Sequence, residues 1–401
     1  MRILKVSQTY FPFQAEGGRP TKVRALANGL ARRGHDVTVL TADMGFGKPG
    51  GPPEPLSRIR WGWRAEEDCV TAIYLRTWAR HRALTLNPGI LSFCAETLGS
   101  FDVVHIYGLY DLIGFPVASR CLRRDIPYVV EPIGMFRPIV RSLWLKRAYH
   151  FLGGKRLVQR ASRVIATSDK EQEEFISGGI AESNIMIRRN GVEVPERLPQ
   201  SGSFRRKMGI PENAKLILFI GRLIAKKSPD LLLRAYTRWR QEAGRGMTSV
   251  LILGGPDEGD GYLPKLEKLS RELGLGETVR FTGPLYDDAK WEAYRDADVF
   301  VLPSQHENFG NTAAEAVACG APVIVTDRCG IAPVVNGRAG LMVPYGEAEL
   351  ERALAKILAE ESPRERYQAG CEEVARDLTW KEPITEMEAL YSKLKVGSKA
   401  K

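Results

Sequence analysis

The chain has 401 residues, of which 44% are hydrophobic and 26% charged. These values are ordinary for a globular protein, so they exclude a disordered or fibrous chain. The length predicts two or three domains, each large enough to bury its own core. No apolar run reaches the roughly 18 residues that a membrane-spanning helix needs, and residues 1–8 are too short and too interrupted in apolar character to predict a signal peptide.

The net charge of +10 is unevenly distributed along the chain. Residues 1–195 hold 28 basic and 18 acidic residues, whereas the remainder holds 30 of each sign. This asymmetry favours a partner or surface that only the first half contacts. The sequence contains no zinc-finger, RRM or basic-zipper pattern, so we expect no nucleic acid and favour an anionic membrane surface or a phosphorylated acceptor.

The six cysteines form no Cys-x-x-Cys pair, and the five histidines show no metal-ligand spacing. A disulfide framework or a zinc site is therefore not expected. A reducing cytoplasm is the compartment that fits this cysteine usage.

The first half alternates short apolar runs with amphipathic stretches. Val23, Leu26 and Leu30 have the spacing of one helix face, and Arg32-Arg33-Gly34 is typical of a helix end. Strands are predicted at Ile3–Val6, Val37–Leu40, Val70–Leu75, Val103–Ile106, Tyr128–Val130 and Val164–Ala166. Strands that alternate with helices predict a parallel sheet covered on both faces.

A cluster of Pro, Ser and Gly at residues 195–203 predicts a linker, after which the same pattern starts again. Residues 232–239 have helix spacing, and strands are predicted at Leu216–Ile220, Val250–Leu253, Val279–Thr282, Val299–Leu302 and Val323–Val325. The chain is thus predicted to be α/β, with two doubly wound units in tandem. In such folds ligands bind beyond the carboxyl ends of the strands, and two units that face each other leave a cleft.

The most informative segment runs from residue 297 to residue 316. A buried strand ends at Pro303, a polar loop holds Glu307 and Gly310, and a helix is expected from Asn311 or Thr312. Amides of the loop and of the first helical turn would bind phosphate, while carboxylates would accept hydrogen bonds from sugar or ribose hydroxyls. Thr312 and Glu315 also match a capping box, which would give Glu315 a structural role; the two roles do not exclude each other.

This segment, with Glu307 and Glu315 eight positions apart, resembles the signature of the retaining glycosyltransferases of family 4, which have the GT-B fold. Further pieces follow in the family's order and cover nearly the whole chain: Glu16-Gly17-Gly18, residues 33–39, Asp102–His105, Asn190-Gly191-Val192, Gly221–Leu223 with Lys226-Lys227, and Asn336-Gly337 with Gly340-Leu341. The resemblance implies two Rossmann-like domains that face each other across a cleft and a nucleoside-diphosphate sugar as donor.

The resemblance implies roles for individual residues. Arg222 and Lys227 would bind the diphosphate, whose negative charge increases as the sugar leaves; isolated, they could equally be solvated surface cations. Glu307 would lie near the donor sugar hydroxyls, and Glu315 would bind the ribose. Other residues expected at the donor are Gly17, Gly18, Thr282, Gly283, Asn308, Phe309, Gly310 and Asn311.

Family members often read His-x-His at the end of the strand that here contains His105, and their second histidine usually reaches the donor sugar. In this chain the second position is Tyr107. His105 and Tyr107 share one face of the strand, and a tyrosine could still donate a hydrogen bond to a sugar hydroxyl. Both are therefore candidate catalytic residues, with a core histidine as the alternative for His105.

Two other motifs are rejected. Gly45–Gly50 matches a dinucleotide-binding pattern, but four prolines within residues 49–55 block the helix that such a site needs. Asp296 and Asp298 match the DxD motif of metal-dependent glycosyltransferases, but they are expected at the end of a helix and the start of a strand. We therefore expect no metal and no cofactor besides the donor.

Residues 120–163 carry a cluster of basic side chains with aromatic and apolar residues among the later ones. Only Asp125 and Glu131 oppose the cations, which are Arg120, Arg123, Arg124, Arg137, Arg141, Lys146, Arg147, Lys155, Arg156, Arg160 and Arg163. Such a segment is typical either of a weak contact with an anionic membrane or of a solvated helix with a core stripe.

We therefore expect a glycosyltransferase that moves a hexosyl unit from a nucleotide sugar to a glycan or lipid-linked acceptor in the assembly of a cell-surface polysaccharide or glycolipid. Residues 1–195 would form the acceptor-side domain, residues 210–380 the nucleotide-sugar domain, and residues 381–401 a helix that returns to the first domain, plus a tail. The enzyme would be cytoplasmic, peripheral at the inner face of the membrane. The alternatives are a sugar-nucleotide 2-epimerase of the same fold and a non-catalytic sugar-nucleotide-binding subunit.

Overall fold

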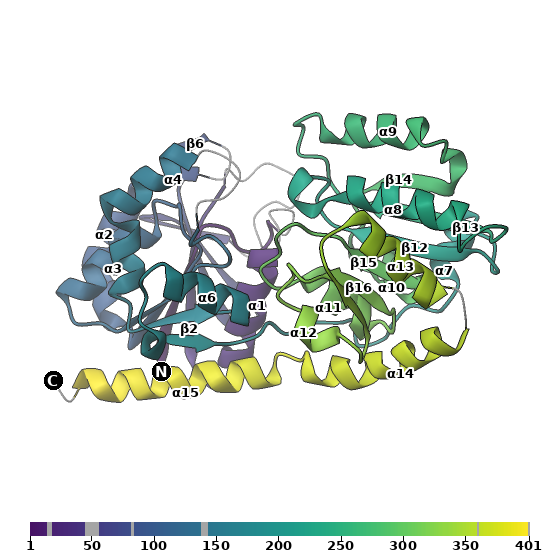
Figure 1. Cartoon of the computed structure of the whole chain (residues 1–401). Helices are drawn as coiled ribbons and strands as arrows, with labels where there is room; N and C mark the ends of the chain where they lie inside the picture. Colours follow the sequence, from purple (N-terminus) through teal and green to yellow (C-terminus); the bar gives the residue numbers. More distant parts are fainter. Residues whose placement is uncertain (14–17, 45–55, 82–83, 138–142, 359–360, 400–401) are drawn as a thin grey trace. The chain divides into compact units, whose positions relative to one another are not determined.

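The computed structural model describes residues 1–13, 18–44, 56–81, 84–137, 143–358 and 361–399. The chain forms two compact units: unit 1 comprises Met1–Gly191 and Trp380–Lys401, and unit 2 comprises Val192–Thr379 (Figure 1). Gly17, the Gly45–Gly50 motif and Arg141 lie outside the described residues. Among the helices that are described, none is both long and apolar enough to cross a membrane.

Unit 1 is built on one sheet with the strand order β11-β10-β9-β8-β1-β2-β5-β4-β3. The strands from β11 to β5 are parallel. Their bounds are β1 Arg2–Ser7, β2 Asp36–Ala42, β3 Leu56–Ile59, β4 Gly62–Glu67, β5 Val70–Leu75, β8 Val103–Tyr107, β9 Tyr128–Glu131, β10 Arg163–Ala166 and β11 Ile185–Ile187. A separate hairpin pairs β6 Ala79–His81 with β7 Leu84–Leu86.

The predicted parallel arrangement of unit 1 is correct except at one edge; the strand at the other edge, β11, is parallel but was not predicted. At the first edge β4 pairs antiparallel with β5, and β3 pairs antiparallel with β4. The sequence analysis missed both strands because they have no apolar run: burial alternates along β4, and β3 has no buried residue. Antiparallel strands at a sheet edge can have one face packed on the core and the other face exposed to solvent, so they need no continuous apolar run.

The helices of unit 1 cover both faces of its sheet. They are α1 Gly18–Ala31, α2 Gly89–Glu96, α3 Gly114–Arg123, α4 Leu143–Tyr149, α5 Lys155–Gln159, α6 Asp169–Ser177 and α15 Lys381–Lys399, with a π-helical turn η3 at His150–Gly154. Val23, Leu26 and Leu30 of α1 are fully buried, as their spacing predicts. The C-terminal helix α15 packs against α1, where Glu388 accepts hydrogen bonds from Arg33 and His35 (Figure 1).

Unit 2 contains a fully parallel sheet with the order β14-β13-β12-β15-β16-β17. The bounds are β12 Lys215–Ile220, β13 Ser249–Gly254, β14 Val279–Gly283, β15 Val299–Leu302, β16 Val323–Thr326 and β17 Gly340–Val343. The chain runs outward from β12 to one side and then crosses to β15 on its other side. This is the order of a doubly wound fold, and the ligand crevice of such a sheet lies where the direction reverses, between β12 and β15.

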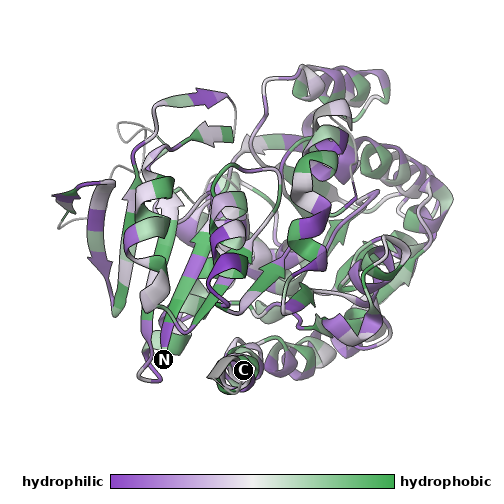
Figure 2. Cartoon of the chain, turned by 90° about the vertical axis from the view of Figure 1, so that its left-hand side faces the viewer, coloured by the Kyte–Doolittle hydropathy of each residue, from purple (hydrophilic) through white to green (hydrophobic). Residues whose placement is uncertain are grey.

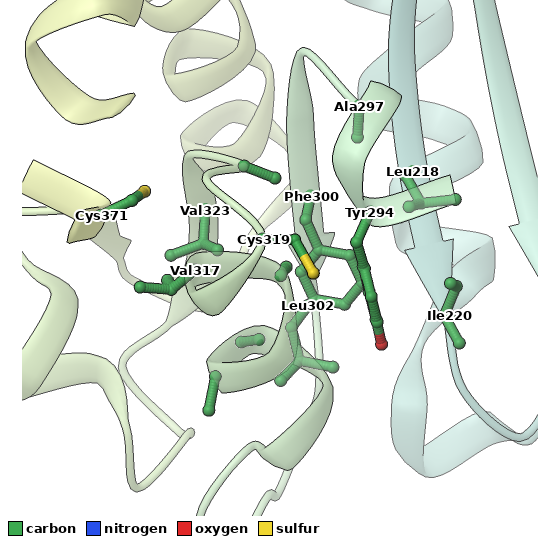
Figure 3. Close-up of a cluster of buried hydrophobic side chains, with 14 of the residues drawn as sticks. Leu218, Ile220, Tyr294, Ala297, Phe300, Leu302, Val317, Cys319, Val323 and Cys371 are labelled. Carbon is green, nitrogen blue, oxygen red and sulfur yellow. The ribbon is translucent and has the colours of Figure 1, made fainter. Parts of the chain in front are cut away.

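The helices of unit 2 are α7 Ser203–Met208, α8 Pro229–Gln241, α9 Tyr262–Glu272, α10 Asp287–Asp296, α11 Asn311–Ala318, α12 Ala332–Val335, α13 Glu347–Leu358 and α14 Glu361–Asp377. One face of the sheet packs against α10 and α11 through Phe300, Tyr294 and Val317, which are shown in Figure 3. The hydrophobic stretches of the strands of unit 1 are visible in Figure 2, whereas the helices carry both hydrophobic and hydrophilic residues.

The predicted linker, residues 195–203, is irregular except for its last residue, Ser203, where α7 begins. Residues 192–202 contain no helix or strand, but α7 follows directly, and its Phe204 is 3% exposed within the core of unit 2. The carboxylate of Asp296 accepts hydrogen bonds from the backbone amides of Gly202 and Arg205. These contacts attach the start of α7 to the end of α10.

Candidate active site

Two of the predicted site residues, Lys227 and Glu307, come together at the switch point of unit 2, and Arg222 lies earlier in the segment that follows β12. Arg222 follows the end of β12, and Lys227 ends the short 3₁₀ turn η5, Ala225–Lys227. Glu307 lies in the loop between β15 and α11. The carboxyl ends of β12 and β15 are neighbours in the sheet, so the two loops meet above the crevice where a doubly wound unit binds its ligand.

The ammonium of Lys227 donates a hydrogen bond to the Glu307 carboxylate, and the two form an ion pair. Both side chains are largely buried, with 15% and 18% exposure. Burial alone would raise the pKa of Glu307, but Lys227, together with Lys226 and His306, holds it below its ordinary value. Glu307 is therefore a carboxylate at neutral pH, which can accept hydrogen bonds from hydroxyl groups.

Backbone hydrogen bonds on both sides hold the loop that carries Glu307. The Gln305 amide donates to the Lys226 carbonyl at 2.9 Å, which ties the loop to η5. Glu307 itself donates to the Arg328 carbonyl at 3.0 Å and accepts from Gly330 at 3.1 Å. The position of the carboxylate is thus set by the two segments that flank it.

The helix that follows begins at Asn311, with Gly310 as its N-cap residue. Gly310 has φ +112, and a Cβ atom there would lie 2.9 Å from the Ile331 side chain, so only glycine fits. Phe309 is 2% exposed and packs in the core of unit 2, so its side chain does not face a ligand. The start of α11 follows the carboxyl end of β15, and half-buried Asn308 and Asn311 lie at that start.

The capping-box prediction for Thr312 and Glu315 is wrong, because Gly310 takes the N-cap position and the helix already includes Thr312. Glu315 instead accepts hydrogen bonds from Lys290 Nζ at 3.1 Å and from the Tyr294 hydroxyl at 3.0 Å. Both donors come from α10. Glu315 is thus a half-buried carboxylate held by two side chains, one turn into α11.

Of the remaining predicted donor residues that the structure describes, two end an edge strand of unit 2 and one begins a helix of unit 1. Thr282 and Gly283 end β14; the Gly283 carbonyl accepts a hydrogen bond from Gly255 at 2.8 Å, and Gly283 has φ +71. In unit 1, the exposed Gly18 is the first residue of α1.

His105 and Tyr107 are fully buried inside unit 1, at 0% exposure. Their rings stack at 4.0 Å, and Nδ1 of His105 lies 2.6 Å from the Tyr391 hydroxyl of α15. The ammonium of Lys5 donates to the Tyr107 hydroxyl at 2.7 Å. Their placement favours the interpretation of His105 as a core histidine, and Tyr107 is part of the same interior.

Sequence analysis missed the buried charge cluster around these residues. Glu131, fully buried at the end of β9, forms ion pairs with Lys22 at 2.7 Å and with Arg188 at 2.6 Å. Burial and then Arg188 lower the pKa of Lys5 to about 7. Burial, together with Lys5 and Arg188, lowers the pKa of His105 well below its ordinary value, so His105 is neutral at neutral pH. The available signal was a charged residue inside or directly beside an apolar strand, as with Lys5 and Glu131.

Both carboxylates of the DxD-like motif have partners within unit 2. Asp298 accepts from Arg205 Nη2 at 2.7 Å and from the Leu216 amide at 2.6 Å. Asp296, the last residue of α10, accepts from the amides of Gly202 and Arg205. These contacts give both residues a role in joining α7, α10 and β12.

Two family models match the chain, one in each unit. The model described as "Glycosyl transferase 4-like domain" matches residues 17–191, and the one described as "Glycosyl transferases group 1" matches residues 200–373. Among relatives, a D-inositol 3-phosphate glycosyltransferase of Thermomonospora curvata is 32% identical, covering 94% of this chain and 90% of its own. One of the same name from Corynebacterium jeikeium is 28% identical, with 98% and 97% covered.

Solved structures with the same fold include the sucrose-phosphate synthase of Thermosynechococcus elongatus, with a TM-score of 0.76, 20% identity and 99% of each chain covered. Anabaena HepE, solved in complex with UDP and glucose, has a TM-score of 0.75 and 18% identity, with 98% of this chain and 100% of HepE covered. The parallel sheets of both units and these structural neighbours confirm the predicted GT-B fold. The chain belongs to the family 4 glycosyltransferases of the GT-B fold.

Proposed function

We propose that this enzyme transfers a hexosyl unit, with retention of anomeric configuration and without a metal, from a nucleoside-diphosphate sugar to a glycan or lipid-linked acceptor. Its place would be the cytoplasmic side of the membrane, in the assembly of a cell-surface polysaccharide or glycolipid. Relatives that are named glycosyltransferases support transfer over the two alternatives, a sugar-nucleotide 2-epimerase and a non-catalytic binding subunit.

The observation that carries this proposal is the set of charges at the switch point of unit 2. Two cations, Arg222 and Lys227, follow β12, and α11, with the amides of its first turn, follows the neighbouring strand β15. A diphosphate is the ligand that satisfies both the cations and the amides. Glu307 then lies where a sugar attached to that diphosphate would present its hydroxyls.

In the proposed reaction the bond between the sugar C1 and the β-phosphate oxygen breaks, and the electron pair stays on the diphosphate. Arg222 and Lys227 stabilise this charge, which is larger in the transition state than in the bound donor. The acceptor hydroxyl attacks C1 from the same face, and its proton passes to the departing phosphate oxygen. No carboxylate nucleophile is needed in this scheme.

Unit 1 carries a surface that suits an acceptor embedded in an anionic membrane. Trp144 and Phe151 are 71% and 91% exposed, and basic Lys155 and Arg156 lie on the adjoining helix α5. A neighbouring groove between α2 and α3 is lined by Leu91, Cys94, Ala95, Phe115, Pro116, Ser119, Arg120 and Arg123. Exposed apolar side chains beside cations are typical of peripheral membrane contact.

The relatives' names point to a second acceptor class. A D-inositol 3-phosphate glycosyltransferase acts on a small phosphorylated polyol, and the positive charge of residues 1–195 would suit such an anion as well. Anionic liposomes separate the two: a lipid-linked acceptor predicts sedimentation of the protein with phosphatidylglycerol vesicles at low salt, and a soluble phosphorylated acceptor does not require it.

The donor is tested with a thermal-shift panel of UDP, GDP, ADP and their glucose conjugates. The matching nucleotide should stabilise the enzyme by about 2.7 kcal/mol at a hundredfold excess over its Kd. Incubation with the donor alone then distinguishes the alternatives, because an epimerase would convert the sugar without an acceptor. A protein that none of these nucleotides stabilises would contradict the proposed function.

A further inference from the structure

The guanidinium of Arg222 forms an ion pair with Glu258, which was not predicted from the sequence. Its Nη1 donates to the carboxylate of Glu258, and the two form an ion pair with exposures of 51% and 28%. Glu258 lies in the glycine-rich loop between β13 and α9, residues 255–261. The cation expected to bind a donor phosphate therefore already contacts an anion from its own unit.

Backbone contacts build this ion pair into the fold. The Gly221 amide donates to the Gly254 carbonyl at 2.9 Å, and the Leu223 amide donates to the Pro256 carbonyl at 3.0 Å. These bonds lie on either side of Arg222 and extend the pairing of β12 with β13 into the two loops. A Cβ atom at Gly255 would lie 1.7 Å from the Gly221 carbonyl oxygen, so the close approach depends on glycine. The loops, and with them Arg222 and Glu258, are held side by side.

We propose that Glu258 is a competing counter-ion: it occupies the Arg222 guanidinium in the empty site, and the donor diphosphate displaces it. The inference rests on the proposed function, since it assigns the regulation of that same site. Carboxylates and phosphates bind the same two-pronged edge of a guanidinium. Both are anions, so they cannot share Arg222 without repulsion.

The competition weakens binding of the nucleoside diphosphate and speeds its release after transfer. Exposed ion pairs contribute little to stability, so the diphosphate can displace Glu258. The diphosphate also contacts Lys227 and the amides of α11, which Glu258 does not replace. Removing the competing charge is expected to tighten diphosphate binding by about twofold to fivefold. Glu258 is thus a positioning residue that acts through Arg222 and does not touch the sugar.

The test uses calorimetric titration of the full chain at low ionic strength with inorganic pyrophosphate, UDP, GDP and ADP. Glu258→Gln should lower the Kd for pyrophosphate and for the matching nucleoside diphosphate by about twofold to fivefold. Glu258→Asp, which keeps the charge, should remain near wild type. Glu272→Gln is the matched control, because it removes a carboxylate from an exposed ion pair with Lys268 in the same unit.

An Arg222→Ala background tests the mechanism, because the gain from Glu258→Gln should disappear when the guanidinium is absent. In transfer assays Glu258→Gln should lower the KM for the donor without raising kcat. Unchanged or weaker binding in Glu258→Gln overturns the inference, and so does a gain that persists in Arg222→Ala. If wild type binds neither pyrophosphate nor any of the nucleotides, the proposed function fails together with it, whereas equal binding by wild type and Glu258→Gln refutes only the role of Glu258.

Discussion

The ammonium of Lys227 and the carboxylate of Glu307 form an ion pair at the point where the sheet of unit 2 reverses its strand order. The pair joins a cation suited to a phosphate with a carboxylate suited to sugar hydroxyls. Both residues lie beyond strand ends: Lys227 ends the turn η5, and Glu307 lies in the loop after β15. The arrangement is expected where the bond between sugar and phosphate is broken.

Loss of Lys227 should slow transfer far more than it weakens binding. Lys227→Ala removes a cation whose contact with the leaving diphosphate is strongest in the transition state, so kcat should fall on the order of 10²–10³-fold. Arg222→Ala should behave in the same direction. Steady-state kinetics with saturating acceptor measure the effect. The matched control is Lys268→Ala on α9, which removes an exposed lysine from the same unit and should leave kcat near wild type; near-normal turnover of Lys227→Ala would contradict the assigned role.

Glu315→Gln should weaken nucleotide binding and leave kcat nearly unchanged. If its carboxylate accepts hydrogen bonds from the ribose hydroxyls, an amide in its place should raise the Kd for the nucleoside diphosphate about tenfold. Glu292→Gln on α10 is the control, because Glu292 is also a carboxylate held by a lysine, Lys207. Pyrophosphate, which has no ribose, should bind Glu315→Gln and wild type equally; an equal loss for both ligands would argue for a structural effect instead.

Gly310→Ala should destabilise unit 2 by about 1–3 kcal/mol, because the added methyl group meets Ile331 and the backbone has φ +112. Gly337→Ala is a suitable comparison: Gly337 has φ +74, but nothing lies within 4 Å of its Cβ position. The difference between the two variants in the free energy of urea unfolding measures the contribution of the steric contact between the added methyl group and Ile331. Equal destabilisation would show that the loop adjusts to a side chain at Gly310.

The buried Lys5 predicts a pH dependence of stability. Burial and Arg188 lower its pKa in the folded chain to about 7, whereas an unfolded lysine titrates near about 10.4. Unfolding therefore takes up a proton above about pH 7, so the free energy of unfolding should rise with pH between about 7 and 9, by up to about 1.4 kcal/mol per pH unit.

Urea unfolding of wild type and Lys5→Met at several pH values between 7 and 9 measures this contribution. Tyr107, His105, Glu131 and Arg188 surround Lys5 and remain in the variant. The variant should lack the rise, so the difference in unfolding free energy between the two proteins should change steadily with pH. A constant difference would mean that Lys5 keeps an ordinary pKa in the fold.

The strands of both cores could be predicted from the sequence because they are short apolar runs buried on both faces. Val103–Tyr107 and Val299–Leu302 are examples in which every residue is buried. The strands β3 and β4 could not, since one-sided burial leaves a pattern of mixed polarity. The spacing of apolar residues in a sequence reflects which residues are buried, and an edge strand has few buried residues.

The sequence predicts those residues of the candidate site that directly follow a buried strand. Arg222, Lys227 and Glu307 each follow a buried strand, and the doubly wound order places those strand ends together. Pairings between distant segments were not predictable: nothing local in the sequence connects Arg222 with Glu258, or His105 with Tyr391. The N-cap at Gly310 was missed because the sequence alone does not show which residue adopts a positive φ.

The most direct test of the proposed site is a crystal structure of the enzyme with its matching nucleoside diphosphate, chosen from UDP, GDP and ADP. We expect the β-phosphate within about 3 Å of the Arg222 guanidinium and the Lys227 ammonium, with the amides at the start of α11 beside it. A nucleotide whose phosphates contact neither cation, or that lies away from the carboxyl ends of β12 and β15, would contradict the proposed site.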